Sequence, residues 1–278
     1  MPRQISLPPR SPAPVSLRRA PALPAGVGRG WWTFDGGAKI AALVLYSHFP
    51  WAAAALFFGP DLYLLYGLLR PASQAVGRVF TCFRPAGAEV WLTIDDGPDP
   101  DDTPRLLELL DRHRARASFF LIGARADRHP ELVAEILRRG HEVGHHTYRH
   151  PVADFWCASP RRVADELDRG LEALRRAGAQ PRRFRPPVGI KSLFLARALA
   201  RRGLVCVAWN VRTGDSFGRD PRRIAARALR RVRPGDIILA HEGPAVAPGV
   251  RVEAIRLILE GLAARGLSCV VPRAEQLR

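Results

Sequence analysis

From residue 90 onward the chain alternates short apolar runs with longer stretches whose apolar positions recur at helical spacing. Seven of the runs are rich in aliphatic and aromatic side chains and are bounded by polar, glycine or proline residues, as buried strands commonly are. The predicted strands cover residues 90–95, 117–122, 141–144, 183–185, 204–209, 236–240 and 267–271. This alternation predicts an α/β fold with a largely parallel sheet.

Six helices are expected between these strands. The first begins near Thr103 and Pro104, and the others cover residues 130–139, 160–177, 191–202, 221–232 and 250–265. A glycine follows four of them at the position where a left-handed residue commonly ends a helix, namely Gly140, Gly178, Gly203 and Gly266. The strict alternation favours a barrel of βα units over an open dinucleotide-binding sheet, because no GxGxxG follows the first strand.

The N-terminal part of the chain has a different pattern. Residues 1–38 are rich in proline and arginine with little apolar periodicity, which predicts a disordered basic extension. Residues 40–60 then contain no Asp, Glu, Lys or Arg, a length that can cross a bilayer, and a second apolar patch follows at 62–69. We therefore expect a membrane-anchoring segment at 39–70, and one large domain at 80–278.

Three arrangements of the apolar segment remain open. It could form one span over residues 40–60 followed by an interfacial segment, although His48, Pro50 and Gly59 weaken that span, or a tight pair of short, proline-broken helices. In a soluble protein it would be a buried hairpin covering the catalytic domain. Basic residues on both sides, such as Lys39 and Arg70, leave the orientation undecided.

Composition adds a strong positive charge. The net charge of +17 in 278 residues comes almost wholly from arginine, since Lys39 and Lys191 are the only lysines. The arginines are spread over helix faces, so they indicate either solvated surfaces or attraction to an acidic polymer or anionic membrane. No recognition-helix pattern or basic strand with interleaved aromatics occurs, and we expect no nucleic-acid partner. The four cysteines have no metal-type spacing and are expected to be buried apolar residues.

The candidate chemistry lies at the ends of the predicted strands. Asp95 and Asp96 end the first strand, and His146 and His150 follow the third about 50 residues later. One carboxylate and two imidazoles form a three-ligand site that leaves positions on a divalent metal open for water and substrate. The other carboxylate could then act as a base. Taken singly, these residues could equally be a solvated turn and a surface histidine pair.

Further polar residues fall at the same strand ends. Arg185, Asp215 and His241 lie at or just beyond the carboxyl ends of later strands, where βα loops build active sites in barrels of this kind. Residues almost 150 positions apart would thus meet on one rim. Together, the order and placement favour a metal-dependent hydrolase.

The motifs resemble those of the polysaccharide deacetylases of the NodB-homology type, carbohydrate esterase family 4. Residues 93–98 (Thr-Ile-Asp-Asp-Gly-Pro), 146–150 (His-Thr-Tyr-Arg-His), 185–189 (Arg-Pro-Pro-Val-Gly) and 239–241 (Leu-Ala-His) are similar to four family motifs in the family's order. The resemblance covers residues 90–271 and implies a distorted (β/α)7 barrel of the NodB type.

The resemblance also implies a role for each motif residue. Asp95 corresponds to the general base, and His241 to the general acid. Arg185 corresponds to an arginine near the base. The metal ligands would be Asp96, His146 and His150, with Zn2+ the family's commonest ion and Co2+, Mn2+ or Ni2+ also compatible with the ligand set.

Two motifs depart from the family pattern. Val188 stands where the family has an aromatic residue, which leaves its backbone N–H as an oxyanion donor and removes a ring from the sugar groove. Asp215 could orient His241, although Ser216 and Arg212 replace residues common in that motif. We expect Pro187, Val188 and Trp209 to contact substrate.

The implied activity is removal of N-acetyl groups from N-acetylglucosamine-type units of a polysaccharide, such as peptidoglycan, a chitin-like polymer or an exopolysaccharide. Two alternatives remain: a deacylase or deformylase of a lipid-linked amino sugar, and a catalytically silent glycan-binding membrane protein. The expected partners are a carbohydrate polymer or glycolipid and a membrane, with no obligate protein partner. The expected location is the bacterial inner membrane, with the domain facing the periplasm or cell envelope.

Overall fold

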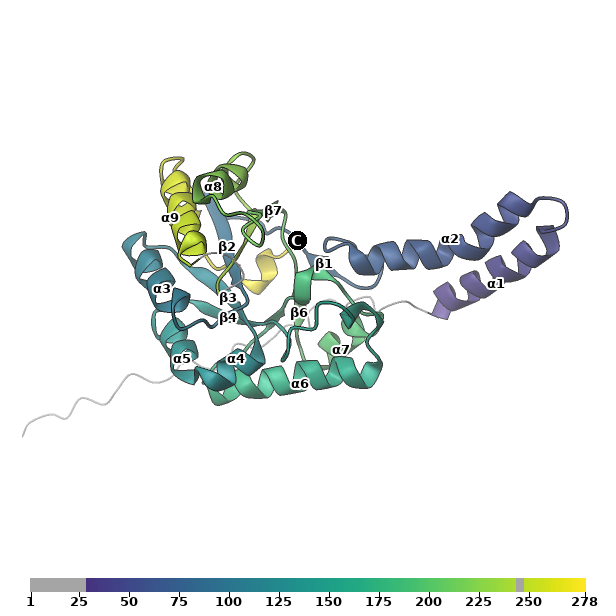
Figure 1. Cartoon of the computed structure of the whole chain (residues 1–278), viewed down its shortest axis with the longest axis horizontal. Helices are drawn as coiled ribbons and strands as arrows, with labels where there is room; N and C mark the ends of the chain where they lie inside the picture. Colours follow the sequence, from purple (N-terminus) through teal and green to yellow (C-terminus); the bar gives the residue numbers. More distant parts are fainter. Residues whose placement is uncertain (1–28, 244–247) are drawn as a thin grey trace, which may run out of the picture.

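A computed structural model describes residues 29–243 and 248–278, which form an α/β domain and a helical hairpin that extends from it (Figure 1). Residues 1–28, for which the sequence predicts disorder, lie outside the described residues. Seven of the strands fall where the sequence predicts them, and β1 and β7 are additional. The strands are β1 Val79–Phe80, β2 Glu89–Asp95, β3 Ala117–Leu121, β4 Glu142–His145, β5 Arg183–Phe184, β6 Val205–Val207, β7 Val211–Arg212, β8 Ile237–His241 and β9 Ser268–Cys269.

The strands form one parallel sheet in the order β1-β6-β5-β4-β3-β2-β8-β7, with β9 pairing with the start of β2. The predicted α/β class and parallel sheet are confirmed, and of the predicted distorted (β/α)7 barrel the structure shows, over the residues it describes, a curled sheet that does not close. Within the described residues, β1 and β7 lie at opposite ends of this order and do not pair. Closure needs a continuous ladder between the end strands, and β1 and β7 have two residues each. The sheet is a curled half-barrel.

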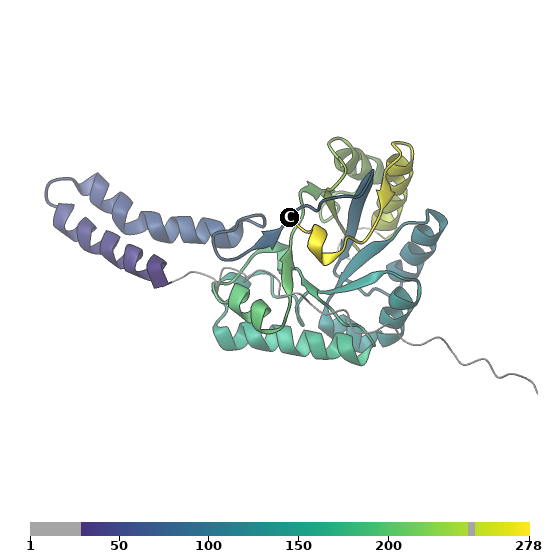
Figure 2. The same cartoon turned by 180° about the vertical axis from the view of Figure 1, so that it is seen from behind.

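Helices cover the outer face of the curled sheet (Figures 1 and 2). All six predicted helices are present, and the four predicted glycine ends are confirmed by positive φ angles of 78° at Gly140, 89° at Gly178, 65° at Gly203 and 69° at Gly266. The short α4 was not predicted, because six residues are too few to show a periodic pattern. The helices are α3 Asp102–Arg112, α4 Gly123–Arg128, α5 Pro130–Arg138, α6 Pro160–Arg176, α7 Leu195–Arg201, α8 Pro221–Leu229 and α9 Val250–Ala263, with 3-10 turns η1 Phe155–Cys157, η2 Pro187–Gly189 and η3 Ala274–Gln276.

The central strand β2 is buried on both faces, which explains its continuous apolar sequence. Val90, Leu92 and Ile94 pack in the core beneath the outer helices. Trp91 faces the inside of the curled sheet, where its Nε1 donates to Ser118 Oγ at 2.9 Å. Cys206 and Cys269 are buried as expected, whereas Cys82 is half-buried and Cys157 is exposed, contrary to expectation. All four cysteines are free thiols.

The N-terminal segment is a helical hairpin of α1 Arg29–Leu45 and α2 Pro50–Leu69. The prediction of disorder is therefore wrong for residues 29–38, where packing such as Trp31 on Tyr63, with ring centroids 5.7 Å apart, stabilises α1. A single span over 40–60 is also wrong, because the chain reverses at Tyr46–Phe49 and Pro50 starts a new helix.

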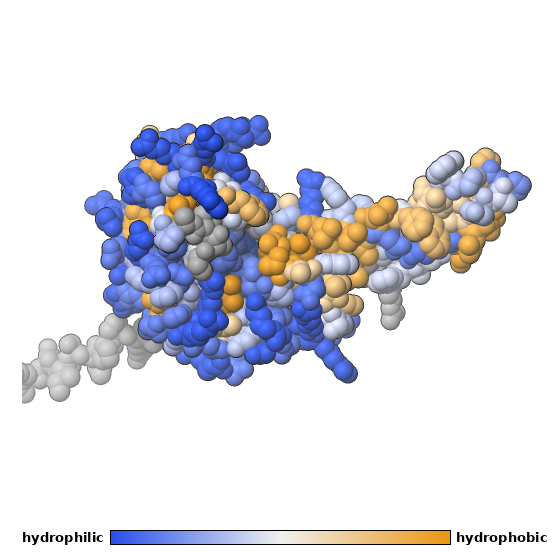
Figure 3. Space-filling model, in the orientation of Figure 1, coloured by the Kyte–Doolittle hydropathy of each residue, from blue (hydrophilic) through white to orange (hydrophobic). Residues whose placement is uncertain are grey.

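The hairpin does not cover the catalytic domain. It points away from the domain in both views, and its surface is largely apolar (Figures 1–3). Leu43 is 72% exposed and Trp51 is 88% exposed. The expectation for a soluble protein, a buried covering hairpin, is therefore wrong. Among the described helices, α2 alone is long and apolar enough to cross a membrane, a criterion that some helices of soluble proteins also meet.

Candidate active site

The sheet register gathers the candidate residues at the carboxyl ends of four neighbouring strands. Asp95 at the end of β2 pairs with His241 at the end of β8. On the other side of β2, Asp95 pairs with Phe120 of β3, whose next residue Leu121 pairs with His145 of β4. Because all these strands are parallel, the residues that leave their ends meet on one rim.

Asp96, His146 and His150 form a compact cluster on this rim. Their nearest ligand atoms all lie within 4.8 Å of one another. Asp96 Oδ1 is 3.5 Å from His146 Nε2 and 3.3 Å from His150 Nε2. The same oxygen is buried without a hydrogen-bond partner, which is costly for a carboxylate unless a cation binds there. One carboxylate oxygen and two imidazole nitrogens therefore fit a divalent metal.

A hydrogen bond fixes the orientation of His146. Its Nδ1 lies 2.7 Å from the carbonyl oxygen of Arg185, which can only accept. Nδ1 therefore carries the proton, and the lone pair of Nε2 faces Asp96. Burial and the nearby His146 hold the pKa of His150 down to about 4, so this ring is neutral near neutral pH and can donate a lone pair as well.

The loop between the two histidines is held in an uncommon backbone conformation. Thr147 and His150 both have positive φ angles, 63° and 59°. The Thr147 hydroxyl donates to the His146 carbonyl at 2.5 Å and accepts from the His150 N–H at 3.0 Å. These bonds stabilise a strained turn that directs both rings to one side.

Glu166 of α6, which was not among the predicted site residues, supports this loop from below. Its carboxylate is fully buried and accepts the backbone N–H groups of Tyr148 at 3.0 Å and Arg149 at 2.8 Å. It also accepts Arg149 Nε at 2.7 Å. The sequence contains a signal that could have identified it: Glu166 interrupts the apolar stripe of an amphipathic helix, between Val163 and Leu167.

Asp95 is buried and paired with Arg185. Arg185 Nη1 lies 2.6 Å from Asp95 Oδ1, and the guanidinium is fully buried. Its remaining hydrogen bonds go to Thr93 Oγ1 and to the carbonyl oxygens of Val207 and Ala208. The other Asp95 oxygen, Oδ2, lies 3.8 Å from His146 Nε2, at the edge of the metal-ligand cluster.

His241 is paired with Asp215. His241 Nδ1 lies 2.7 Å from Asp215 Oδ1, and the His241 backbone N–H donates to Asp215 Oδ2 at 2.7 Å. Burial disfavours a charged imidazole, but the hydrogen bond and charge of Asp215, with the nearby Asp95 and Asp96, raise the pKa of His241 above its usual value. The structure thus places on the rim beside Asp95 a partly buried imidazole whose charged form Asp215 stabilises.

The predicted substrate-contacting residues adjoin the site. Pro187 is buried, whereas Val188 is 46% exposed and adopts a positive φ of 48° in η2. Gly189 has a φ of 76°, and a Cβ there would lie 2.5 Å from Pro71 and 2.9 Å from Trp209. Trp209 and Pro71 therefore pack directly against the loop that carries Val188. We call residues 68–71, at the end of α2, the hairpin foot, and residues 187–191 the groove loop.

Glu242 forms a second buried acidic group that the sequence did not reveal. It is fully buried beneath the Asp96 turn and accepts a hydrogen bond from the Thr103 hydroxyl. Burial, against the effect of that hydrogen bond, raises the pKa of Glu242 to about 8, so its carboxyl group is mainly neutral at pH 7. A Cβ at Gly97 would meet Glu242 Oε1 at 1.7 Å, so only glycine fits there.

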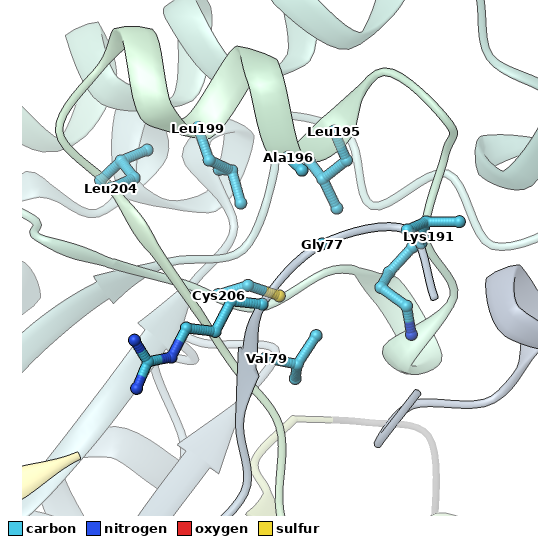
Figure 4. A pocket seen from close by; sticks show the side chains of 10 residues that line it. Gly77, Val79, Lys191, Leu195, Ala196, Leu199, Leu204 and Cys206 are labelled. Carbon is cyan, nitrogen blue, oxygen red and sulfur yellow. The ribbon is translucent and has the colours of Figure 1, made fainter. Parts of the chain in front are cut away.

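A cavity away from the rim lies under the linker between α2 and β1 (Figure 4). Leu195, Ala196 and Leu199 of α7 line one side, Cys206 lies opposite, and Lys191 lies at one end. Its volume is about 20 Å³, enough for about one water molecule. It is too small to be a sugar site.

Known proteins resemble this chain throughout the α/β domain. The family model described as polysaccharide deacetylase matches residues 84–207. A chitooligosaccharide deacetylase of Bradyrhizobium sp. is 36% identical over 189 residues, covering 67% of this chain and 84% of the relative. The chain belongs to the polysaccharide deacetylase family. The resemblance inferred from the four motifs is thereby confirmed.

Two further comparisons extend this assignment to sequence and structure. A peptidoglycan-N-acetylglucosamine deacetylase of Bacillus cereus is 34% identical over 162 residues, covering 55% of this chain and 72% of the relative. The structure of a family 4 carbohydrate esterase from Streptomyces lividans, in complex with acetate, superimposes with a TM-score of 0.62 and 31% identity. That match covers 68% of this chain and 95% of the esterase, so this chain has the fold of the family's catalytic domain.

Proposed function

We propose that this protein is a metal-dependent hydrolase that removes N-acetyl groups from N-acetylglucosamine-type units of a polysaccharide. The observation that carries this proposal is the rim on which a cluster able to hold a metal ion, a buried carboxylate and a carboxylate-paired imidazole meet. Asp96, His146 and His150 would hold the ion, with Asp96 Oδ1 as the buried oxygen that lacks another partner. When bound, Zn2+ or a similar ion (Co2+, Mn2+ or Ni2+) would lower the pKa of a water molecule and polarise the amide carbonyl.

Asp95 would act as the general base, and Arg185 would hold it in position. Asp95 takes a proton from the attacking water, as its free Oδ2 faces the metal-ligand cluster. Arg185 holds Oδ1 at 2.6 Å and so prevents the carboxylate from rotating toward the ligands. The Val188 N–H, on an exposed turn beside the rim, is the proposed backbone donor for the tetrahedral oxyanion.

His241 would act as the general acid, and Asp215 would orient it. His241 donates a proton to the nitrogen of the departing amine, which leaves as a free amino sugar together with acetate. Asp215 keeps the proton on Nδ1 and favours the charged imidazolium before the transfer. Pro187, Val188 and Trp209 form the proposed wall of the sugar groove.

The proposal can be tested by acetate release from N-acetylglucosamine oligomers. The full chain is depleted of metal with a chelator, and the rate is measured before and after Zn2+ is added. We expect release to depend on the added metal and to be lost in the Asp96→Asn variant. Equal release by the metal-free and metal-loaded protein would contradict the proposal.

A lipid-linked amino sugar is a second candidate substrate, and one observation favours it. The hairpin foot contacts the groove loop, because Lys191 N donates to Leu68 O at 2.9 Å and Lys191 Nζ donates to Arg70 O at 2.6 Å. If the hairpin anchors the protein in a membrane, as we also propose, the groove opens close to lipid headgroups. Comparing rates on soluble oligomers, peptidoglycan fragments and glycolipids distinguishes the two substrate classes.

A catalytically silent glycan-binding protein is disfavoured by the intact set of chemical groups. A binding protein has no chemical need for the base Asp95 and the acid His241 in addition to metal ligands. Tight zinc binding without turnover on any amino-sugar substrate would support the silent alternative. The bacterial inner membrane, with the domain on the periplasmic or envelope side, remains our proposed location.

A further inference from the structure

The surface of the α1–α2 hairpin is apolar over most of its length. Figure 3 shows apolar residues along the hairpin, whereas the visible face of the α/β domain is mostly hydrophilic. The exposed apolar and aromatic side chains of the hairpin are Trp32, Phe34, Ile40, Leu43, Val44, Tyr46, Phe49, Trp51, Phe57, Phe58, Leu62, Tyr63, Tyr66 and Leu69. A patch this extensive on a soluble surface marks an interaction site.

A small charged cluster divides the hairpin into two parts. Lys39 Nζ lies 2.7 Å from Asp35 Oδ2 and 3.1 Å from Asp61 Oδ2, so the cluster links α1 to α2. Between Lys39 and Asp61 the chain contains no acidic residue, lysine or arginine. We call the part between them, residues 40–60, the hairpin tip.

The tip has the depth of one leaflet. A helix rises about 1.5 Å per residue, so residues 40–45 of α1 reach about 9 Å and residues 50–60 of α2 about 16 Å. The hydrocarbon core of a bilayer is about 30 Å thick, which gives about 15 Å for a leaflet. The tip therefore reaches approximately to the bilayer midplane when the charged cluster is at the headgroup level.

Insertion of the hairpin across the whole bilayer is unfavourable. At the same rise the 20 residues of α2 reach about 30 Å and the 17 residues of α1 about 26 Å, so only α2 matches the thickness of the core. A crossing would also place the Lys39 cluster within the hydrocarbon. That cluster has two carboxylates for one ammonium group, so it would carry an uncompensated negative charge there. At the headgroup level, water solvates the excess carboxylate.

The residues on the domain side of the cluster suit a membrane interface. Trp32, Tyr63 and Tyr66 are exposed there, and tryptophan and tyrosine prefer the headgroup region. Arg70 and Arg78, both exposed at or near the hairpin foot, add positive charge that attracts anionic headgroups.

We propose that the hairpin enters a single leaflet of an anionic lipid membrane, with Tyr46–Phe49 near the midplane and the Lys39 cluster at the headgroups. This inference rests on the proposed membrane anchorage and specifies its mode. Both arms then return to the side on which they entered. The foot is fixed to the groove loop by Lys191 and Gly189, so the catalytic rim is held at the surface of that same leaflet.

The proposal is tested with a fluorescent label at the tip. The full chain carries Ser47→Cys, labelled with the NBD fluorophore, after Cys82→Ser and Cys157→Ser remove the two cysteines that are not buried. It is added to sealed vesicles of phosphatidylethanolamine and phosphatidylglycerol. Matched labels at Leu62→Cys and Glu108→Cys report the interface and the domain surface.

We expect the Ser47→Cys label to be quenched more by spin-labelled lipids with deep acyl labels than by shallow ones, and the Leu62→Cys label to show the reverse. Dithionite outside the vesicles should reduce the Glu108→Cys label at once and the Ser47→Cys label at least 10-fold more slowly. Reduction of the Ser47→Cys label by dithionite trapped inside the vesicles would show crossing and overturn the proposal.

Two further results would also overturn it, and they can be told apart from failure of the deacetylase proposal. Equal external reduction of the Ser47→Cys and Glu108→Cys labels would mean that the tip stays in water. Failure of the chain to sediment with vesicles would remove the anchorage itself. Acetate release from soluble oligomers does not require vesicles, so the enzymatic proposal is judged independently.

Discussion

At the residue scale, the two adjacent carboxylates differ because of the backbone that carries them. Asp95 ends β2 and is fixed by Arg185. Asp96 has left the strand with a φ of 76°, a left-handed conformation that aspartate tolerates better than most residues. This turn directs the Asp96 carboxylate to His146 and His150, so one residue can bind metal while its neighbour remains available as the base.

The pairing of His241 with Asp215 predicts a pH effect. His241 donates a proton only while it is charged, so activity should fall as pH rises through its raised pKa. Asp215→Asn removes the carboxylate that raises this pKa, and the basic limb of the kcat/KM profile should move to lower pH. We also expect kcat to fall about 10-fold or more. An unchanged basic limb would show that Asp215 does not control the acid.

His241→Ala and His146→Ala separate acid catalysis from metal binding. His241→Ala should keep its metal and lose about 100-fold or more in turnover, because the leaving amine no longer receives a proton. His146→Ala should lose metal and activity together. Metal content and acetate release are measured on both variants. Full metal occupancy in His146→Ala, or wild-type turnover in His241→Ala, would remove that residue from its proposed role.

Sequence could predict the reactive residues but not their buried supports. Asp95, Asp96, His146 and His150 are identifiable because they occupy strand ends in a recognisable spacing. The supporting roles of Glu166 and Glu242 instead depend on which loop packs over each carboxyl group. Tertiary contacts decide that packing. Glu242 looks like an ordinary surface glutamate until the fold places it, and the only sequence signal for Glu166 is its position within the apolar stripe of α6.

At the element scale, the loop from His146 to His150 and helix α6 act as one unit. The loop's two left-handed residues are strained, and the buried Glu166 carboxylate offsets this by accepting two backbone N–H groups. The distance between the two histidine nitrogens is therefore set partly by a helix that contributes no ligand.

Glu166→Gln should weaken metal binding while the protein stays folded. An amide can accept only with its oxygen, so at least one of the three hydrogen bonds to the loop is lost. We expect about a 10-fold to 100-fold weaker metal affinity, measured by chelator competition. Glu172→Gln, an exposed position of the same helix, is the matched control. Wild-type affinity in Glu166→Gln would mean that the loop holds its shape unaided.

Strand and helix positions were predictable because each repeats a local pattern, whereas closure of the sheet was not. Strict alternation suggested a barrel, but β6 is followed by the two-residue β7 without an intervening helix. The hairpin was difficult for a related reason. Residues 40–60 carry no Asp, Glu, Lys or Arg, so a single span and a pair of helices both remained open. The reversal depends on Tyr46–Phe49 and on the contacts between α1 and α2.

At the scale of the whole molecule, the hairpin and the catalytic rim are joined by direct contacts. Lys191 binds the backbone at the end of α2 and lies in the groove loop, just after η2. A membrane that holds the hairpin thus determines where the groove faces. If the hairpin enters a membrane as proposed, membrane-borne amino sugars lie close to the groove.

Charged tip variants should separate anchorage from catalysis. Leu43→Glu and Trp51→Glu place carboxylates where the hairpin would contact acyl chains. We expect vesicle partitioning to fall at least 10-fold, with normal acetate release from soluble oligomers and reduced release from a vesicle-borne amino sugar. Phe194→Glu, an exposed apolar position of the domain, serves as the control. Unchanged partitioning of both tip variants would contradict the proposed role of the hairpin.

The most direct test of the central claim compares Asp95→Asn with the wild-type chain for bound metal and acetate release. We expect one divalent ion per chain in both proteins, with release from N-acetylglucosamine oligomers lost only in the variant. Loss of the metal in Asp95→Asn would show that the two aspartates have been assigned the wrong roles. Wild-type release by the metal-loaded variant would contradict Asp95 as the base.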